Sequence, residues 1–204
     1  MPPRRTGTFA KRATRAARAH ALVLRVTIRE IDPPIWRRLL IPDQLTLGQL
    51  HRVLQLVFGW QDYHLYAFEL GERRFEAPDA EAEGEDAAAT TLRTLGLNAG
   101  AEFVYRYDFG DDWEHEILVE EVRPLPAADV EEPWPALLDG ARAGPPEDCG
   151  GAHGYAELVA TLGRPRTRAC AELREWLGEG YDPAVFDRWA IGRILTLAAV
   201  WGAV

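Results

Sequence analysis

The sequence predicts an α+β fold: a single compact domain in which a mixed or antiparallel sheet with a central hairpin packs against helices, with a helical segment at the C-terminus. Apolar and polar residues alternate over residues 22–28 and on both sides of residues 110–112, which is the period of half-buried strands. Apolar residues have helical spacing over residues 46–59 and again after residue 150. Most strands therefore precede most helices, an order typical of the α+β class.

The composition excludes several classes of protein. Of the 204 residues, 47% are hydrophobic and 27% are charged, which indicates a globular chain. No run approaches the ~18 apolar residues of a membrane-spanning helix, and the basic start lacks the apolar segment of a secretory signal. The only cysteines, Cys149 and Cys170, are too few for a disulfide scaffold or a four-cysteine zinc site. We therefore expect a cytoplasmic protein without membrane contact.

Charge divides the chain into an arm and a body. The net charge is −9, yet residues 1–20 contain six basic residues and no acid, so residues 21–204 carry −15. We expect residues 1–20 to be a flexible basic arm and residues 21–204 to form the domain. Because an acidic body repels phosphate, nucleic acid would bind only through the arm. Alternatively, the arm pairs with the acidic segment near residue 80.

The first half of the chain predicts strands around one amphipathic helix. Residues 22–28 read as a strand, and Pro33-Pro34 interrupts the alternation that follows. Thr46 and Gln49 have the spacing of a capping box, which predicts a helix from Thr46, and Gly59 ends it.

A short strand and a loop follow this helix. Residues 64–69 read as a strand, and Thr91–Leu95 as one helical turn. Between them we expect a mobile acidic loop, because its composition is too polar to pack. Its acids are Glu76, Asp79, Glu81, Glu83, Glu85 and Asp86.

The central feature is a hairpin with a three-residue loop, Gly110-Asp111-Asp112. This loop length places all apolar positions on one face. On the other face it sets Arg106 opposite Glu116, a favourable pair, and Asp108 opposite Glu114, an unfavourable one. The predicted apolar-face pairs are Phe109–Trp113, Tyr107–His115, Tyr105–Ile117 and Phe103–Val119.

The C-terminal third predicts a long connection and three helices. The proline-rich connection runs from Pro124 to Gly151, too long for an ordinary loop. The third helix is expected to start at Asp182-Pro183, an N-cap followed by proline. Its predicted apolar stripe is Phe186, Trp189, Ile194, Leu197 and Trp201.

The acids of the hairpin form the first candidate polar site. Asp108, Asp111 and Asp112, with His115 two residues into the next strand, offer the oxygen and imidazole ligands of a divalent cation. A cation would also neutralise Asp108 beside Glu114. The alternative is that Asp111 and Asp112 only form the turn and that His115 is a core-edge residue.

The second candidate is the segment around Cys149. Glu147 and Asp148 precede it, and Gly150-Gly151 follow it at a helix start. Such a turn binds phosphate through its amides, but here the two acids are expected to satisfy those amides themselves. A thiol nucleophile at Cys149 is the weaker alternative to a packed cysteine.

Two further histidines, His51 and His64, complete the set. Each is expected to be a satisfied core residue, unless both converge with His115 on a metal ion. A metal ion, if bound, would be held by Asp111, His115, Glu147 and Asp148, with His51 or His64 as further ligands.

An aromatic groove between the hairpin and the proline-rich loop is a further hypothesis, since Trp and Tyr are enriched in interaction surfaces. Its rim would carry Asp108, Asp111, Glu147 and Asp148. Its lining would be Trp36, Trp60, Tyr66, Tyr107 and Trp113.

Five ordered segments resemble the plasmid pRiA4b ORF-3-like family over roughly residues 21–190. The resemblance implies a compact α+β fold, a setting on plasmids and other mobile elements, and shared polar residues around one site. The segments are Ile31–Arg38, Thr46–His51, Gly59-Trp60 with His64–Phe68, Tyr107–His115, and Pro145–Gly151 with Gly154-Tyr155.

Three functions remain open at this point. The first is a non-enzymatic binding or accessory module of the mobile-element type, with a protein partner or self-association. The second is a metal-dependent hydrolase or nuclease that uses Asp108, Asp111, His115, Glu147 and Asp148, with metal-bound water as nucleophile. The third is DNA binding through the basic arm.

Overall fold

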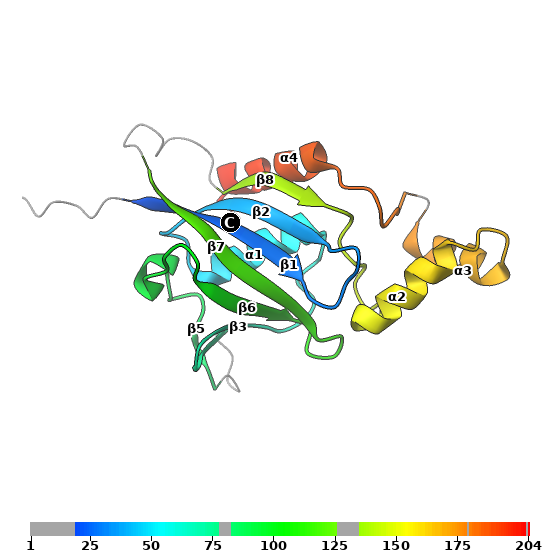
Figure 1. Cartoon of the computed structure of the whole chain (residues 1–204), viewed down its shortest axis with the longest axis horizontal. Helices are drawn as coiled ribbons and strands as arrows, with labels where there is room; N and C mark the ends of the chain where they lie inside the picture. Colours follow the sequence, from blue (N-terminus) through cyan, green and yellow to red (C-terminus); the bar gives the residue numbers. More distant parts are fainter. Residues whose placement is uncertain (1–18, 78–82, 126–134, 179, 203) are drawn as a thin grey trace, which may run out of the picture.

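The fold is built on one eight-stranded sheet with the order β5-β4-β3-β6-β7-β1-β2-β8. The computed structural model describes residues 19–77, 83–125, 135–178, 180–202 and 204, so the arm predicted over residues 1–20 lies almost wholly outside the described residues (Figure 1). The strands are β1 (His20–Ile28), β2 (Trp36–Pro42), β3 (Tyr66–Leu70), β4 (Arg73–Glu76), β5 (Glu85–Asp86), β6 (Glu102–Tyr107), β7 (Trp113–Pro124) and β8 (Ala136–Ala141). The helices are α1 (Leu47–Phe58), the 3-10 turn η1 (Leu92–Leu95), α2 (Gly151–Leu162), α3 (Arg168–Leu177) and α4 (Arg188–Val200).

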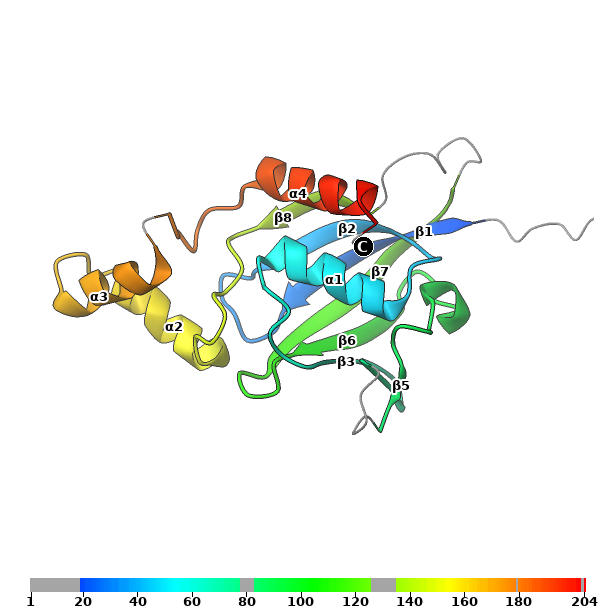
Figure 2. The ribbon, with the colours of Figure 1, turned by 180° about the vertical axis from the view of Figure 1, so that it is seen from behind.

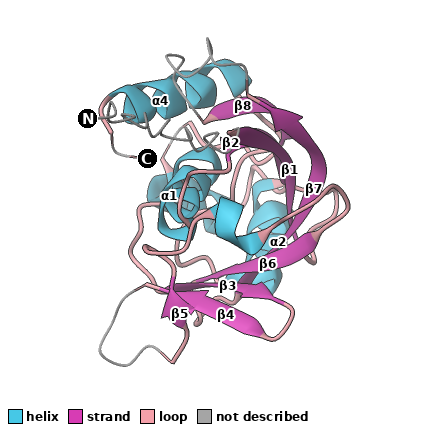
Figure 3. Cartoon of the chain, turned by 90° about the vertical axis from the view of Figure 1, so that its left-hand side faces the viewer, coloured by secondary structure: helices cyan, strands magenta, loops and turns pink. Residues whose placement is uncertain are grey.

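The sheet curves around α1, and the core lies between them (Figures 2 and 3). α4 packs on β8 and α1, whereas α2 and α3 pack on each other and extend from one end of the sheet (Figure 1). The convex face is polar and carries ion pairs such as Arg38–Glu120. The α+β class with a mixed sheet in a single compact domain is therefore confirmed, and β5, parallel to β4, makes the sheet mixed.

The capping box predicted for α1 is present in the structure. The Thr46 side chain accepts from the Gln49 amide, and the Gln49 side chain accepts from the Thr46 amide. Gly59 ends the helix with φ of 84°, a left-handed conformation that favours glycine. The helix buries Leu50, Leu54 and Val57 against the sheet.

The hairpin has a different register from the predicted one. Tyr107 pairs with Trp113 and Tyr105 with His115, so the loop spans residues 108–112 rather than 110–112. The cause is Asp108, whose carboxylate accepts from the next amides while its carbonyl accepts from the Asp112 amide at 2.6 Å. The predicted clash between Asp108 and Glu114 does not arise, because Glu114 pairs with Arg106 and Arg29.

The acidic segment is partly ordered, contrary to the prediction. Glu85 accepts two hydrogen bonds from Arg73, and Glu76 accepts one from Arg74. The Arg73–Glu85 pair joins β4 to β5, whereas Arg74 and Glu76 both lie on β4. The sequence pattern did not assign these arginines to the acids. Asp79 and Glu81 lie outside the described residues.

Two C-terminal predictions are wrong. The proline-rich connection contains β8, and α4 starts at Arg188 with Asp187 as N-cap, because the Asp182 side chain closes a local turn on the Ala184 amide instead. The predicted stripe is largely exposed, including Trp189 at 71%, and the buried residue of α4 is Leu195.

Arg37 joins the layers at the centre of the molecule. This buried side chain donates to the carbonyls of Val57 on α1 and Ala141 on β8, between the rings of Phe58 and Phe186. Burial lowers the pKa of Arg37 to about 10. The guanidinium is thus a fixed cation that satisfies one C-terminal carbonyl of α1, that of Val57.

Candidate metal centre

Three segments that are distant in sequence meet at one end of the sheet. His64 lies just before β3, Asp108 begins the hairpin loop, and Glu147 and Asp148 lie in the loop before α2. His64 Nε2 is 3.0 Å from Asp148 Oδ1, 3.6 Å from Asp108 Oδ2 and 3.9 Å from Glu147 Oε2. One imidazole nitrogen therefore faces three carboxylates.

In two of the carboxylates, Asp108 and Glu147, one oxygen accepts hydrogen bonds from neighbouring protein groups and the other faces His64. Asp108 Oδ1 accepts from the amides of Gly110 and Asp111, which leaves Oδ2 toward His64. Glu147 Oε1 accepts from the Tyr107 hydroxyl at 2.9 Å and from the Gln61 amide at 2.8 Å. Outer-shell bonds of this kind orient the ligands of metal ions in proteins.

The centre contains buried polar atoms without hydrogen bonds. The side chains of Asp108 and Glu147 are only 9% and 10% exposed, and Glu147 Oε2 has no hydrogen-bond partner. His64 Nε2 is also buried and lacks a hydrogen bond, since Asp148 lies at ion-pair distance without suitable alignment. A buried polar atom without a partner costs free energy, so a cation or a water bound by these atoms would stabilise the arrangement.

Negative charge is in excess at this centre. Among the described residues, the ion pairs of Asp108, Glu147 and Asp148 all involve His64. Even a protonated His64 would leave two negative charges uncompensated. A divalent cation would balance them, because bound cations are the largest local charges in such sites.

The geometry fits a single ion. One atom each from His64, Asp108 and Asp148 lies within 4.8 Å of the others. Two ligand atoms bound to one ion at about 2.0–2.6 Å are no more than about 5 Å apart. One nitrogen with carboxylate oxygens suits Mn²⁺, Fe²⁺ or Zn²⁺ better than Mg²⁺ or Ca²⁺, which prefer oxygen alone.

The hairpin loop and the loop before α2 contact each other closely, and each contains an aspartate with positive φ. Asp108 and Asp148 both have φ of 54°, the left-handed region that aspartate tolerates better than most residues. Asp111 Oδ2 accepts from the Gly150 amide, and a Cβ at Gly151 would overlap the Asp111 carbonyl. Asp111 therefore docks the two loops on each other rather than facing His64.

His115 is not placed as a metal ligand, contrary to one expectation. It is fully buried against the Phe58 and Trp60 rings, and its Nδ1 contacts the Tyr105 carbonyl. Burial lowers its pKa to about 3, so it is neutral at pH 7. His115 lies on the apolar face of the hairpin, opposite Tyr105, so its ring packs in the core.

Two other candidates, Asp112 and Cys149, are not among the ligand atoms that lie close together around His64. Asp112 is exposed and faces Arg106 at 3.7 Å. Burial, and then Asp111, raise the pKa of the Cys149 thiol to about 12, which opposes a thiolate nucleophile.

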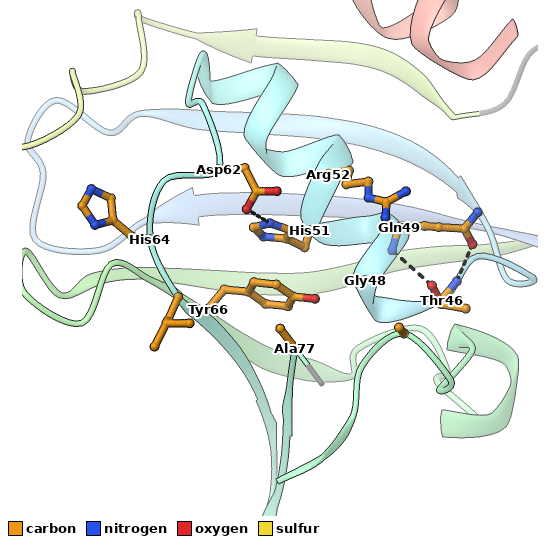
Figure 4. A pocket seen from close by; sticks show the side chains of 11 residues that line it. Thr46, Gly48, Gln49, His51, Arg52, Asp62, His64, Tyr66 and Ala77 are labelled. Atoms are coloured by element: carbon orange, nitrogen blue, oxygen red, sulfur yellow. Dashed lines mark hydrogen bonds and ion pairs between the residues drawn. The ribbon is translucent and has the colours of Figure 1, made fainter. Parts of the chain in front are cut away.

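The aromatic residues do not line an open groove. Trp60, Tyr107 and Trp113 are core residues, and Trp60 stacks on Tyr107. Trp36 lies on the opposite face of the sheet under Arg25, so the hypothesis of one aromatic lining is wrong. Of the five, Tyr66 borders a pocket beside α1 (Figure 4), and Trp113 borders a smaller pocket next to Glu114.

His51 belongs to a separate polar network. Its ring stacks on Tyr66 and contacts the Tyr105 hydroxyl and Asp62 at 2.7 Å each. The other polar members of this network, Asp62, Gln55 and Tyr105, were not predicted from the sequence. His51 and Gln55 are four residues apart and so lie on one face of the helix, and this spacing could have indicated that they share a polar partner.

The fold and this centre define a class of protein: an α+β domain with a curved sheet around one helix and a His/Asp/Glu cluster at the sheet's end. The family model described as "Plasmid pRiA4b ORF-3-like protein" matches residues 20–190, and the chain belongs to this family.

Two relatives support the assignment. The "Uncharacterized protein y4hQ" of Sinorhizobium fredii strain NGR234 is 38% identical over 188 residues, 90% of this chain and 95% of that protein. The crystal structure of MM3350, a protein of unknown function from Methanosarcina mazei Go1, is similar with a TM-score of 0.74 and 30% identity. The matched region spans 84% of this chain and 97% of the MM3350 chain. In the described part of the chain, no helix is long and apolar enough to cross a membrane.

Proposed function

We propose that this protein binds a divalent cation through His64, Asp108, Glu147 and Asp148. The observation that carries the proposal is the unpartnered Glu147 Oε2, nine-tenths buried and aimed at a His64 nitrogen that also lacks a hydrogen bond. Turn and cap chemistry accounts for the other oxygens of Asp108 and Glu147, but not for these atoms.

The ion would join two parts of the fold. Asp108 belongs to the hairpin loop of the sheet, and Glu147 and Asp148 belong to the loop that leads into α2. An ion shared by these ligands would fix the α2–α3 pair on the sheet. Asp148 is 66% exposed, so the ion would keep a solvent-facing position for water, as metal-dependent hydrolysis requires.

The test is titration calorimetry of Mn²⁺ and of Zn²⁺ into tag-free full-length protein that has been stripped with chelator. We expect about one equivalent of one metal to bind. Asp108→Asn and Glu147→Gln should weaken binding at least ~10-fold, since even outer-shell changes have effects of that size.

The matched control is Asp112→Asn. It lies in the same loop, also has positive φ of 52°, and does not face His64. Unchanged affinity in this variant is expected. Absence of binding to the wild-type protein, or equal affinity in all four proteins, would reject the metal centre.

A second candidate, a binding module that self-associates, is supported by β8 and α4. Among the described strands, β8 is the last in the sheet order and has no strand on its outer side. Beside it, α4 exposes Trp189, Leu197 and Trp201. An open edge strand next to an apolar helix face is self-complementary under two-fold symmetry. Light scattering after size exclusion should then give a dimer that Trp189→Glu dissociates, and a monomeric wild type would refute it.

A further inference from the structure

A pocket of about 470 Å³ lies where two chain connections to the α2–α3 pair meet. One connection leads from β8 into α2, and the other leads from α3 to α4 (Figure 1). Two hydrogen bonds join these connections. The Ala143 amide donates to the Pro183 carbonyl at 3.3 Å. The Tyr181 hydroxyl donates to the Gly144 carbonyl at 3.1 Å. The lining residues used below are Arg142, Val159, Leu162, Arg174, Asp182 and Pro183.

Arg142 is a partly buried cation without a counter-ion. Among the described residues it makes no hydrogen bond and no ion pair, and its Nε is buried. Nε is the only unpartnered nitrogen of this guanidinium that is buried, so the two Nη groups remain accessible at the pocket that Arg142 lines. Its backbone has φ of 66°, a costly conformation of the kind that clusters at functional sites. Because a charge shielded from water without a partner costs free energy, an anion at the Nη groups would stabilise this arrangement.

The charged side chains that line the pocket sum to one positive charge. Arg174 on α3 is exposed, and it forms no ion pair with any residue that the structure describes. Asp182 is the acid of the lining, and its Oδ1 accepts from the Ala184 amide at 2.9 Å. In the described part of the chain, Asp182 is not paired with either arginine. Two arginines and one aspartate match a monoanion better than a dianion.

The rest of the lining is largely apolar. Val159 and Leu162 lie in the last turns of α2, and Pro183 and Ala184 lie in the connection after α3. A volume of about 470 Å³ is in the range of small-molecule sites and exceeds what an inorganic ion needs. A complementary ligand therefore combines a carboxylate, which a guanidinium binds in a bidentate manner, with a short apolar body.

We propose that this pocket binds a small apolar monocarboxylate, with its carboxylate on the Nη groups of Arg142 and its apolar body against Val159, Leu162 and Pro183. Arg174 adds positive charge to the pocket, and the proposal requires no contact between Arg174 and the ligand. It is independent of both functions proposed above, because no lining residue belongs to the His64 cluster, to β8 or to α4.

The experiment is saturation-transfer NMR and calorimetry of the full-length protein with hexanoate, with chelator present so that the metal centre plays no part. Hexanamide has the same apolar body without the charge, and hexyl phosphate carries a second negative charge. We expect hexanamide to bind at least ~10-fold more weakly than hexanoate, as for loss of a charged partner. Hexyl phosphate should bind no more tightly than hexanoate.

Three results would each overturn the proposal. The first is that hexanoate does not bind at millimolar concentration, and the second is that hexanamide binds as well as hexanoate. The third is that hexyl phosphate or inorganic phosphate binds more tightly than hexanoate, which would make the pocket a phosphate site.

Variants test the role of Arg142 separately from folding. Arg142→Gln should weaken hexanoate binding at least ~10-fold. Arg166→Gln is the matched control and should bind as the wild type does, since Arg166 is an exposed arginine between α2 and α3 that does not line the pocket. Unchanged affinity in Arg142→Gln, or an equal loss in both variants, would contradict the assignment.

Asp182→Asn provides a gain of binding, which a folding defect would not produce. Asparagine keeps an acceptor for the Ala184 amide and removes the one negative charge of the described lining. Hexanoate should bind ~2–5-fold more tightly to this variant, the size of one screened charge interaction, and hexyl phosphate should gain more than hexanoate. No gain for either ligand would show that the anion does not sit in this pocket.

Discussion

His64 and His115 show how burial gives one residue type two roles. His115 has no exposed surface, and burial lowers its pKa to about 3, so it serves as a neutral core residue. The His64 side chain is 28% exposed, and its nitrogen faces three carboxylates. The same imidazole is thus a packing element in one place and a proposed metal ligand in the other.

The buried His115 makes stability depend on pH. Its folded pKa of about 3 lies below the unfolded value of ~6.5, so below pH 6.5 protons bind preferentially to the unfolded state and stability falls until about pH 3. At pH 5 the loss is about 2 kcal/mol relative to pH 7. Urea unfolding at both pH values, with chelator, should show a smaller loss for His115→Gln. An equal loss in both proteins would contradict this account.

Gly151 tests the contact between the two loops. An added Cβ would overlap the Asp111 carbonyl, and φ is 65°, so Gly151→Ala should lower the free energy of unfolding by more than ~1 kcal/mol. Gly180→Ala is the control, because a Cβ there meets nothing within 4 Å. Thermal and urea unfolding of both variants provide the comparison, and equal stabilities would argue against the close approach.

Several residue roles were accessible from sequence and others were not. The Thr46 and Gln49 capping box depends only on local spacing and was predicted correctly. The candidate carboxylates Asp108, Glu147 and Asp148 were named from residue type. Their convergence on His64 depends on three separate segments, which one sequence does not relate to each other.

At the scale of elements, α4 is the clearest departure from the predicted pattern. Its apolar residues surround most of the helix, so spacing alone did not identify the packed face, and Leu195 rather than Leu197 contacts the core. Leu195→Ala should therefore lower the free energy of unfolding by about 2–5 kcal/mol, and Leu197→Ala by about 0.5 kcal/mol or less. Urea unfolding distinguishes them, and the reverse order would restore the predicted stripe.

The other elements were missed for physical reasons that the structure makes plain. β8 lies within a proline-rich segment and pairs with β2 at only one edge, so it lacks the strong alternation of central strands. The hairpin pairs Tyr107 with Trp113 instead of the predicted His115. The loop is longer than predicted because Asp108 makes hydrogen bonds with the backbone of the loop residues. Side-chain bonds to the backbone in turns outweighed the alternating pattern there.

At the scale of the whole molecule, the proposed ion would couple the α2–α3 pair to the sheet. Ligands from both sides bind only when the loops are in contact, so metal binding stabilises the folded joint by mass action. At a metal concentration of 100 times Kd, the gain is about 2.7 kcal/mol.

Hydrogen exchange is the measurement for this coupling. Addition of the metal that binds should slow amide exchange in residues 108–112 and 147–151, while α4, distant from the centre, should exchange as before. The same addition to Glu147→Gln should change neither segment. Protection spread evenly over the protein, or none in these loops, would contradict a local joint.

The most direct test of the metal centre is anomalous X-ray scattering from a crystal of the full-length protein soaked in Mn²⁺. The account predicts one strong peak at about 2.0–2.3 Å from His64 Nε2 and from the carboxylate oxygens of Asp108 and Asp148, with Glu147 Oε2 as the remaining protein ligand. No peak at this position, with His64 hydrogen-bonded to Asp148 in its place, would contradict the account.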